Sequence, residues 1–212
     1  MPAPLAFITV AILSASPVIQ ELQKSYESIQ TIEAKFTQVY RSKRFGDRKS
    51  SGKVWLKKPG QMRWDYDQPK GKVMVADGKS LTLFDPDDNQ AIVSPVGDEG
   101  DLPPPLSFLW GKRKLEEGFD VTKIARLKGA PEGDTILECL PKKPISNVSK
   151  IYLFVRESRP WTVTGTRVID SLDGENEIRF SDLQTNGTVS AERFRFDIPK
   201  GAVRVAPQSK EN

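Results

Sequence analysis

The chain has 212 residues, with 32 Lys and Arg against 28 Asp and Glu, no histidine and one cysteine. The absence of histidine removes the usual general base near neutral pH and the commonest transition-metal ligand. Cys139 is expected to be a buried, inert thiol, since it can form neither an intramolecular disulfide nor a thiolate zinc site. The net charge of +4 is spread along the chain, unlike the basic stripe typical of nucleic-acid binding. We therefore expect no enzyme, no catalytic residue, no metal, no cofactor and no nucleic-acid partner.

The N-terminal region carries an apolar run over residues 5–15. This run is too short to cross a membrane and has the length of the hydrophobic part of a signal peptide. No Lys or Arg precedes it, so a buried first helix is the alternative. We expect residues 1–16 to be a signal segment, residues 17–205 to form one domain and residues 206–212 to form a disordered polar tail.

The first elements of the domain follow from the spacing of apolar residues. Helical spacing predicts an amphipathic helix over residues 18–30, with Ser16 as a candidate N-cap. Alternation then predicts a strand over residues 32–40, and residues 42–51 are expected to form a polar loop. Residues 54–90 carry short alternating runs between turn signals, which predicts an antiparallel meander with one apolar, aromatic face.

An apolar helical segment is expected to interrupt the strands in the middle of the chain. It should begin near Pro105 and end at Gly111, with a short helical turn over residues 112–117. Alternation predicts six more strands after it, and three of the turns between them contain glycine. They are expected at residues 119–127, 135–140, 150–156, 161–169, 175–183 and 192–198.

These elements predict a mainly β (α+β) fold. Twisted sheets of about 10–11 strands curl, so we expect a single antiparallel sheet forming an unclosed half-barrel, covered by a lid of two or three short helices. The expected inward face consists of Ala34, Phe36, Val54, Leu56, Met62, Trp64, Tyr66, Val73, Val75, Leu81, Leu83, Ile178, Phe180, Phe194 and Phe196. Such a face is most often a solid core, but the small amount of helix relative to sheet favours a ligand cavity.

Several short motifs occur in a fixed order along nearly the whole chain. They are AKFTQ (34–38), VWLKKP (54–59), Trp64, QP (68–69), DGKSL (77–81), DP (85–86), Gln90 and FRFDIPKG (194–201). In this order and spacing, the chain resembles the periplasmic outer-membrane lipoprotein carrier family, LolA. The resemblance implies a half-open β-barrel with a helical lid, whose hydrophobic cavity takes the acyl chains of a lipoprotein in the periplasm.

The resemblance also implies partners and a site. The partners are acylated lipoproteins, an inner-membrane lipoprotein-releasing ABC transporter that contacts the carrier transiently and, where present, an outer-membrane lipoprotein acceptor; the carrier itself is a monomer. Trp64 matches the aromatic residue that the family points into its cavity, and Met62 matches a neighbouring aromatic position. The full set of cavity candidates is Phe36, Val54, Leu56, Met62, Trp64, Tyr66, Val73, Val75, Leu81, Leu83, Leu106, Leu109, Ile178 and Phe180.

Lys58 is the candidate for a lid latch. It stands where the family usually has an arginine that hydrogen-bonds to the lid and holds the empty form closed. Lysine offers a point charge in place of the planar guanidinium fork, so a bidentate latch is lost. A solvated charge in a turn is the alternative interpretation of Lys58.

Three other functions remain open at this point. A periplasmic binder of another lipid or of a glycolipid would use the same cavity. A solid-core envelope adaptor domain would have no ligand and would exclude hydrophobic dyes. An enzyme would need a pair of Asp or Glu side chains inside the basin, and none of the expected inward residues is acidic.

Overall fold

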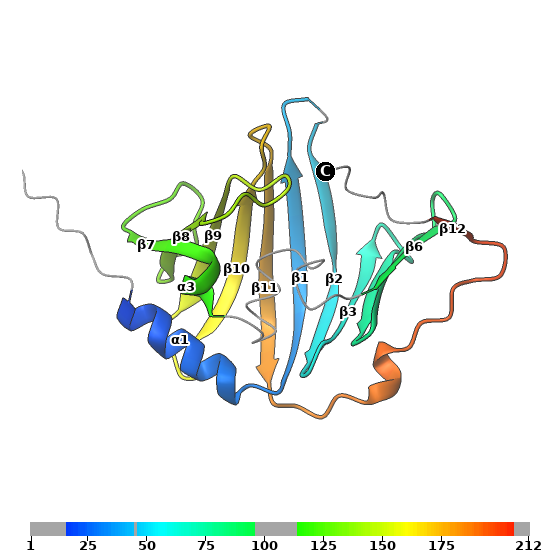
Figure 1. Ribbon diagram of the computed structural model, residues 1–212, viewed down its shortest axis with the longest axis horizontal. Helices are drawn as coiled ribbons and strands as arrows, with labels where there is room; N and C mark the ends of the chain where they lie inside the picture. The colour runs from blue at the N-terminus through cyan, green and yellow to red at the C-terminus, as the bar shows by residue number, and fades with distance from the viewer. Residues whose placement is uncertain (1–15, 45, 96–113, 206–212) are drawn as a thin grey trace, which may run out of the picture.

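Twelve strands form one sheet in the computed structural model, which describes residues 16–44, 46–95 and 114–205. The strand order is β12-β6-β5-β4-β3-β2-β1-β11-β10-β9-β8-β7, so β1 and β11 lie next to each other at the centre (Figure 1). Neighbours pair in antiparallel fashion except β12, which pairs with β6 in parallel. The predicted mainly β fold with one unclosed sheet is confirmed, with slightly more strands than expected.

The described helical elements are α1 (Ser16–Ser28), α3 (Leu115–Gly118) and the 3₁₀ turn η1 (Ala191–Phe194). The strands are β1 (Thr31–Arg41), β2 (Arg48–Lys57), β3 (Gln61–Gln68), β4 (Val73–Asp77), β5 (Ser80–Asp85), β6 (Gln90–Pro95), β7 (Phe119–Ile124), β8 (Thr135–Pro141), β9 (Lys150–Arg156), β10 (Thr162–Ile169), β11 (Glu175–Thr185) and β12 (Val203–Val205). The helix expected near residues 105–111 lies outside the described residues, as does most of the expected signal segment.

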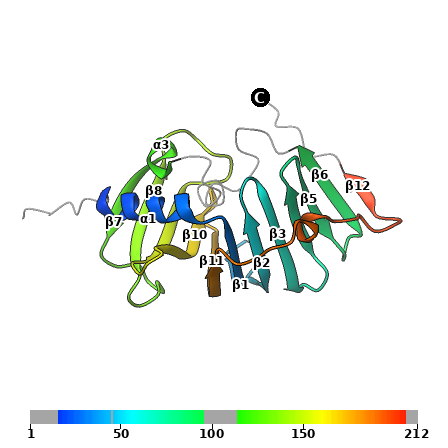
Figure 2. The same cartoon turned by 90° about the horizontal axis from the view of Figure 1, so that it is seen from below.

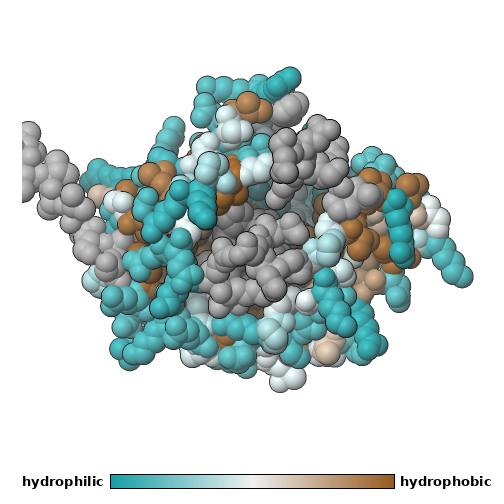
Figure 3. Space-filling model, in the orientation of Figure 1, coloured by the Kyte–Doolittle hydropathy of each residue, from teal (hydrophilic) through white to brown (hydrophobic). Residues whose placement is uncertain are grey.

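Helix α1 forms where the spacing of apolar residues predicts it and lies across one face of the sheet (Figures 1 and 2). Ile19, Leu22 and Tyr26 are buried against that face, and Ile29 continues the apolar stripe just beyond the helix. Hydrophilic side chains cover most of the described surface in Figure 3, while hydrophobic ones show mainly toward the two ends of the sheet. The apolar stripe of α1 is therefore turned into the protein.

The C-terminal part of the chain departs from the predicted strands. The prediction of a strand at residues 192–198 is wrong, because Ser190 caps the 3₁₀ turn η1 there and accepts a hydrogen bond from the Glu192 N–H. The chain then runs past β3 and β5 toward β12 (Figure 2), a strand of three residues that is too short to show alternation. Strand β2 also begins inside the expected polar loop, since backbone pairing with β1 does not require apolar side chains.

The register of the strands divides the apolar residues between two faces. Trp64 lies opposite Val54 and Met74, whereas Val73 and Val75 lie opposite Asp65 and Arg63. Directly opposed residues share a face, so the prediction that Val73 and Val75 face inward with Trp64 is wrong. Strand β4 is apolar at four successive positions (residues 73–76), and such a run does not indicate which face is which.

The outer face carries its own apolar cluster under the C-terminal segment. Phe84 pairs with Val73 and its ring centroid lies 5.7 Å from that of Phe196, while Phe194 is fully buried. Nearby, the Arg63 guanidinium donates to the carbonyls of Arg193 and Arg195 and ties this segment down. The prediction that Phe194 and Phe196 point into the basin is therefore wrong, because their segment crosses the other side of the sheet.

A buried ion network lies on the outer face of β9–β11. Glu177 accepts hydrogen bonds from Arg167 (2.6 Å) and Arg179 (3.0 Å), and both Glu177 and Arg167 are more than nine-tenths buried. The Arg179 guanidinium lies 4.1 Å from the centroid of the Phe154 ring. Both arginines also donate to backbone carbonyls of residues 128–129, so the network holds the loop between β7 and β8 against the sheet.

Candidate functional site

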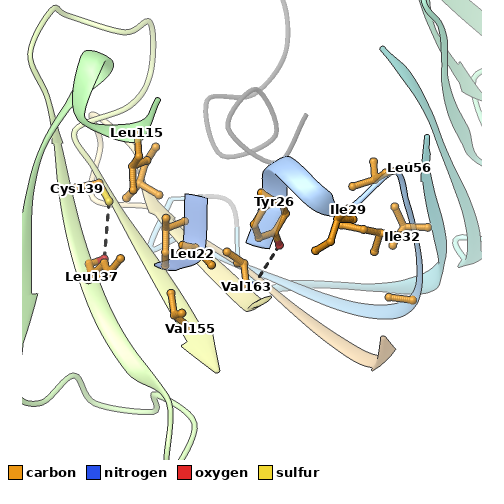
Figure 4. Packing of buried hydrophobic residues seen from close by; sticks show 14 of the residues in the cluster. Leu22, Tyr26, Ile29, Ile32, Leu56, Leu115, Leu137, Cys139, Val155 and Val163 are labelled. Atoms are coloured by element: carbon orange, nitrogen blue, oxygen red, sulfur yellow. Dashed lines mark hydrogen bonds between the residues drawn. The ribbon is translucent and has the colours of Figure 1, made fainter. Parts of the chain in front are cut away.

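The face of the sheet that α1 covers is a continuous apolar surface, which we call the inner wall. Its members are packed with the helix in one cluster, from β2 and β3 across the centre to β8 and β9 (Figure 4). The fully buried ones are Ile32, Ala34, Phe36, Val54, Leu56, Met62, Trp64, Ala76, Leu137, Cys139, Ile151, Leu153, Val155 and Val163. Burial raises the pKa of the Cys139 thiol to about 12, with a smaller contribution from Glu138, which agrees with the predicted inert thiol.

An aromatic cluster occupies the centre of the inner wall. The Phe36 ring packs edge-on against Trp64 and Tyr66, at centroid distances of 4.7 and 5.0 Å, and Trp64 lies 6.0 Å from Phe180. Gly52 makes this packing possible, because a Cβ atom there would lie 2.9 Å from the Phe36 ring and only 2.0 Å from a backbone oxygen. The centre of the wall is therefore shaped by large side chains that have little freedom to move.

Trp64 carries a polar atom into this apolar surface. Its indole Nε1 is buried and, within the part of the chain that the structure describes, has no hydrogen-bond acceptor. A buried donor without an acceptor costs roughly 1–3 kcal/mol. The Trp64 N–H is therefore an unsatisfied donor within the inner wall. A hydrogen-bond acceptor placed next to it would stabilise the protein.

The space between α1 and the wall is small in this arrangement. A cavity with a volume of about 10 Å³ remains, which is about the size of one water molecule. Its lining consists of Tyr26, Ile32, Ala34, Val54, Leu56, Trp64, Val163, Phe180 and Leu183. An acyl chain can enter this space only if α1 or the side chains around it move.

The inner wall extends beyond α1 on the side of β4–β6. Met74 lies opposite Trp64 and Leu83, and Leu81 lies opposite Ala76, so these side chains continue the same face. Met74, Leu81 and Leu83 are only partly buried, in contrast to the wall beneath the helix. The protein thus carries more inner-face apolar surface than α1 covers.

Three polar contacts fix the C-terminal turn of α1. The Lys58 ammonium donates a short hydrogen bond to the carbonyl oxygen of Tyr26, at the helix end where a cation is favourable. The Trp161 N–H donates to Ser25 Oγ (3.0 Å), and the Val163 N–H donates to the Tyr26 hydroxyl (3.2 Å). These contacts hold the helix to the turn between β2 and β3 and to the first residues of β10.

Lys58 is partly buried and Tyr26 is fully buried. Burial lowers the pKa of Lys58, and the charge of Glu27 opposes this effect. Burial also raises the pKa of Tyr26 well above its ordinary value, so its hydroxyl stays protonated. Lys58 is thus bound to α1 in the structure, unlike the solvated turn charge considered from the sequence; its role as a latch stays a prediction.

Replacing Tyr26 by phenylalanine tests how strongly β10 holds the helix. We expect Tyr26→Phe to lower the free energy of unfolding by about 1–3 kcal/mol, because the buried Val163 N–H loses its acceptor. Urea denaturation measures this change, and hydrogen exchange should show faster opening of α1. Tyr40→Phe is the matched control, since it removes a partly buried hydrogen bond to Asp170 away from α1. Equal effects of the two substitutions would contradict the special role of Tyr26.

The predicted site residues fall into four groups. Phe36, Val54, Leu56, Met62 and Trp64 are buried in the inner wall beside α1. Tyr66, Leu81, Leu83, Ile178 and Phe180 lie on the same face and are partly buried. Val73 and Val75 lie on the outer face, and Leu106 and Leu109 lie outside the described residues.

Sequence reasoning missed half of the site. The inner wall on β8–β10, above all Leu137, Leu153 and Val163, was predicted as strand but not as cavity. The same holds for Leu22 and Tyr26 of α1, although their helical spacing was visible. The spacing of apolar residues predicts which of them are buried. It does not predict the strand order that brings them together.

The described residues contain neither a metal-binding group nor a helix that could span a membrane. None of their His, Cys, Asp and Glu side chains forms a group of three or more that could hold a metal ion. No helix among them has the length and apolar character needed to cross a membrane.

An unclosed sheet whose apolar inner face is covered by a short helix defines a class of half-barrel proteins. Within this class, residues 27–197 match the family model described as outer membrane lipoprotein carrier protein LolA. The chain belongs to this family.

Individual relatives agree with this assignment. The chain is 31% identical over 199 residues to an outer-membrane lipoprotein carrier protein of Pseudomonas putida (strain GB-1), covering 93% of this chain and 92% of that protein. It is 29% identical over 185 residues to a protein of the same name from Methylobacillus flagellatus, covering 87% and 86%. Among solved structures, an uncharacterized conserved protein from Thermus thermophilus shares the fold, with a TM-score of 0.56, 12% identity and coverage of 91% and 99%.

Proposed function

We propose that the protein is a periplasmic carrier that binds the acyl chains of lipoproteins against its inner wall. In this proposal it receives the lipoprotein from an inner-membrane ABC transporter and delivers it to the outer membrane, where an acceptor takes over if one is present. It does so as a monomer, without cofactor or catalysis. The observation that carries the proposal is an apolar inner wall that is continuous across the sheet and extends past the 13-residue helix covering it.

Burial of acyl chains supplies the free energy for opening. Each methylene group removed from water contributes about 0.8 kcal/mol, so one long chain offsets the loss of several hydrogen bonds. Polar contacts of Lys58, Ser25 and Tyr26 close α1 together with its buried apolar stripe, whose place on the wall an acyl chain would take. The helix can therefore leave the wall when a chain takes its place and return when the chain is released.

The indole of Trp64 supports a lipid with an ester linkage. Its buried Nε1–H lacks an acceptor among the described residues, and an ester carbonyl at the head of an acyl chain is a hydrogen-bond acceptor. Such a bond would form only in the loaded state. It would also favour acyl chains over plain hydrocarbons of the same length.

The test is a search for a stoichiometric complex with a lipoprotein. The purified protein is incubated with a triacylated lipopeptide in micelles and then separated by size-exclusion chromatography and weighed by native mass spectrometry. A one-to-one complex is expected, and the same peptide without acyl chains should give none. If no complex forms and a hydrophobic dye is excluded, a solid-core adaptor domain is the better interpretation. A glycolipid or another lipid extracted from the purified protein would instead favour a different lipid binder.

Lys58 is predicted to act as the latch that keeps the empty carrier closed. Lys58→Met keeps the aliphatic stem but removes the charged donor to the Tyr26 carbonyl. We expect fluorescence of a hydrophobic dye to rise severalfold and the free energy of unfolding to fall by about 1 kcal/mol, since the ammonium is only partly buried. Lys79→Met, at an exposed lysine in the turn before β5, is the matched control. Unchanged dye binding in the Lys58 variant would show that this contact does not keep the helix closed.

A further inference from the structure

Strands β10 and β11 pair along only part of their length. The ladder runs from Ile169 opposite Glu175 to Gly165 opposite Arg179 and then stops. Beyond this point β11 continues to Thr185 on β1 alone, and β10 continues back to Thr162 on β9 alone. Figure 1 shows the two strands moving apart at this end. We call this opening the β10–β11 split.

Irregularities on both sides shape the split. The register of β10 against β9 shifts between Val163 and Gly165, and the register of β11 against β1 shifts around Asp182. Asp182 has a φ of +51°, a left-handed conformation that few residues other than glycine adopt. Bulges of this kind end pairing and occur preferentially near functional sites, and such backbone strain persists only where the surrounding structure imposes it. The split is therefore built into the sheet rather than caused by frayed strand ends.

Helix α1 is hydrogen-bonded to the β10 side of the split. The backbone N–H groups of Trp161 and Val163, at the start of β10, donate to side chains of α1. In β11, Ser181, Gln184 and Thr185 are in register with β1, and the ladder with β10 does not extend beyond Arg179. Among the described residues, this stretch of β11 thus has a partner strand on the β1 side only.

A polar recess fills the split and joins the apolar cavity. It has a volume of about 390 Å³ and is lined by side chains that include Arg156, Thr162, Ser181 and Thr185. Phe180 and Leu183 line both this recess and the small cavity under α1. The recess and the cavity are therefore neighbours that share these two wall residues.

Two of the three charged residues that line the recess are paired within the protein, and Arg159 is the third. Arg156 pairs with Asp134 at 2.5 Å, and Asp182 pairs with Lys35 at 2.8 Å. What the recess chiefly offers is backbone hydrogen-bonding groups and hydroxyls.

We infer that the β10–β11 split binds the first residues of polypeptide after the lipid anchor, as an extended strand added to β11. This inference rests on the proposed carrier function, in which the cargo is apolar at its anchor and polar immediately beyond it. Beyond the left-handed Asp182, residues 183–185 span about 10 Å, which matches about three residues of extended chain. Hydrogen bonds to the backbone do not depend on side chains, so one edge accepts cargoes of different sequence.

Hydrogen exchange of β11 amides tests the inference. A triacylated lipopeptide with five residues after the lipidated cysteine is compared with a diacylglycerol of the same chain length. The lipopeptide should slow exchange of the recess-facing amides of residues 183–185 at least tenfold, and the diacylglycerol should leave them unchanged. A lipopeptide that forms a one-to-one complex without this protection overturns the inference alone. If neither lipid binds, the proposed function itself fails.

A modified ligand keeps the test independent of protein folding. N-methylation of the lipopeptide backbone at the second to fourth residues removes its donors and leaves its acyl chains intact. We expect its affinity to fall about tenfold or more, since each lost hydrogen bond is worth about a kcal/mol and 1.4 kcal/mol is tenfold. Equal affinity of the methylated and unmethylated peptides would overturn the inference.

Discussion

Replacing Trp64 by glutamate is expected to lower the free energy of unfolding at pH 7 by about 3–5 kcal/mol and to abolish binding of acyl chains. Trp64 is only 2% exposed and packs against Phe36 and Phe180, so the substitution loses large aromatic contacts and places a carboxyl group in an apolar site. The same carboxyl group would face any acyl chain that enters the cavity. Urea denaturation followed by circular dichroism measures the change in stability.

The effect of Trp64→Glu should depend on pH. Burial raises the pKa of a carboxyl group in the folded state above its unfolded value, so the folded variant is destabilised as the pH rises through that range. The difference in stability from the wild type should therefore be smaller at pH 4 than at pH 7. Trp64→Phe is the matched control, because it keeps an aromatic ring and adds no charge. A glutamate variant as stable as the wild type at pH 7 would mean that Trp64 borders open space rather than packed side chains.

Glu177→Gln is expected to cost about 3 kcal/mol of stability at pH 7. The substitution leaves the buried guanidinium of Arg167, and that of Arg179 beside it, without their shared counter-ion. Removing one partner of a buried ion pair is strongly destabilising, because the remaining charge stays desolvated. Glu175→Gln is the matched control, since Glu175 is more exposed and lies 4.0 Å from Arg167. Similar losses at the two positions would contradict the buried network as the source of the effect.

The Glu177 network also predicts a dependence of stability on acid. Burial opposes ionisation of Glu177, but hydrogen bonds and charges from Arg179 and Arg167 outweigh it and lower the pKa. A lowered folded pKa gives stability that is present above the unfolded value of about 4.3 and is lost as the pH falls through the folded pKa. This acid-induced loss should be smaller in Glu177→Gln, which a series of urea denaturations between pH 3 and pH 7 would show.

Much of the sheet could be predicted because its strands alternate clearly. Met62, Trp64 and Tyr66 share one face of β3, with Arg63 and Asp65 on the other, and the structure places them so. The prediction failed where alternation gives no information. Residues 73–76 are all apolar, with Met74 and Ala76 on the inner face, and nothing local shows that Val75 lies outward.

Contacts between segments that are distant in the sequence were the other feature that could not be predicted. The sequence shows an amphipathic helix at residues 18–30, but not that Tyr26 reaches β10 or that Lys58 reaches the end of that helix. Phe194 and Phe196 alternate like a strand, yet Phe194 ends a 3₁₀ turn, Phe196 follows it, and both cover the outer face. Contacts between distant segments depend on the strand order, which a pattern within one segment does not contain.

The central ladder joins the two ends of the domain, since Ile32 on β1 pairs with Thr185 on β11. Folding must therefore close a very large loop before the most central hydrogen bonds can form, and ladders of this kind form slowly. During synthesis the middle of the sheet cannot exist until β11 has left the ribosome. The centre of the core is therefore completed only when nearly the whole domain has been made.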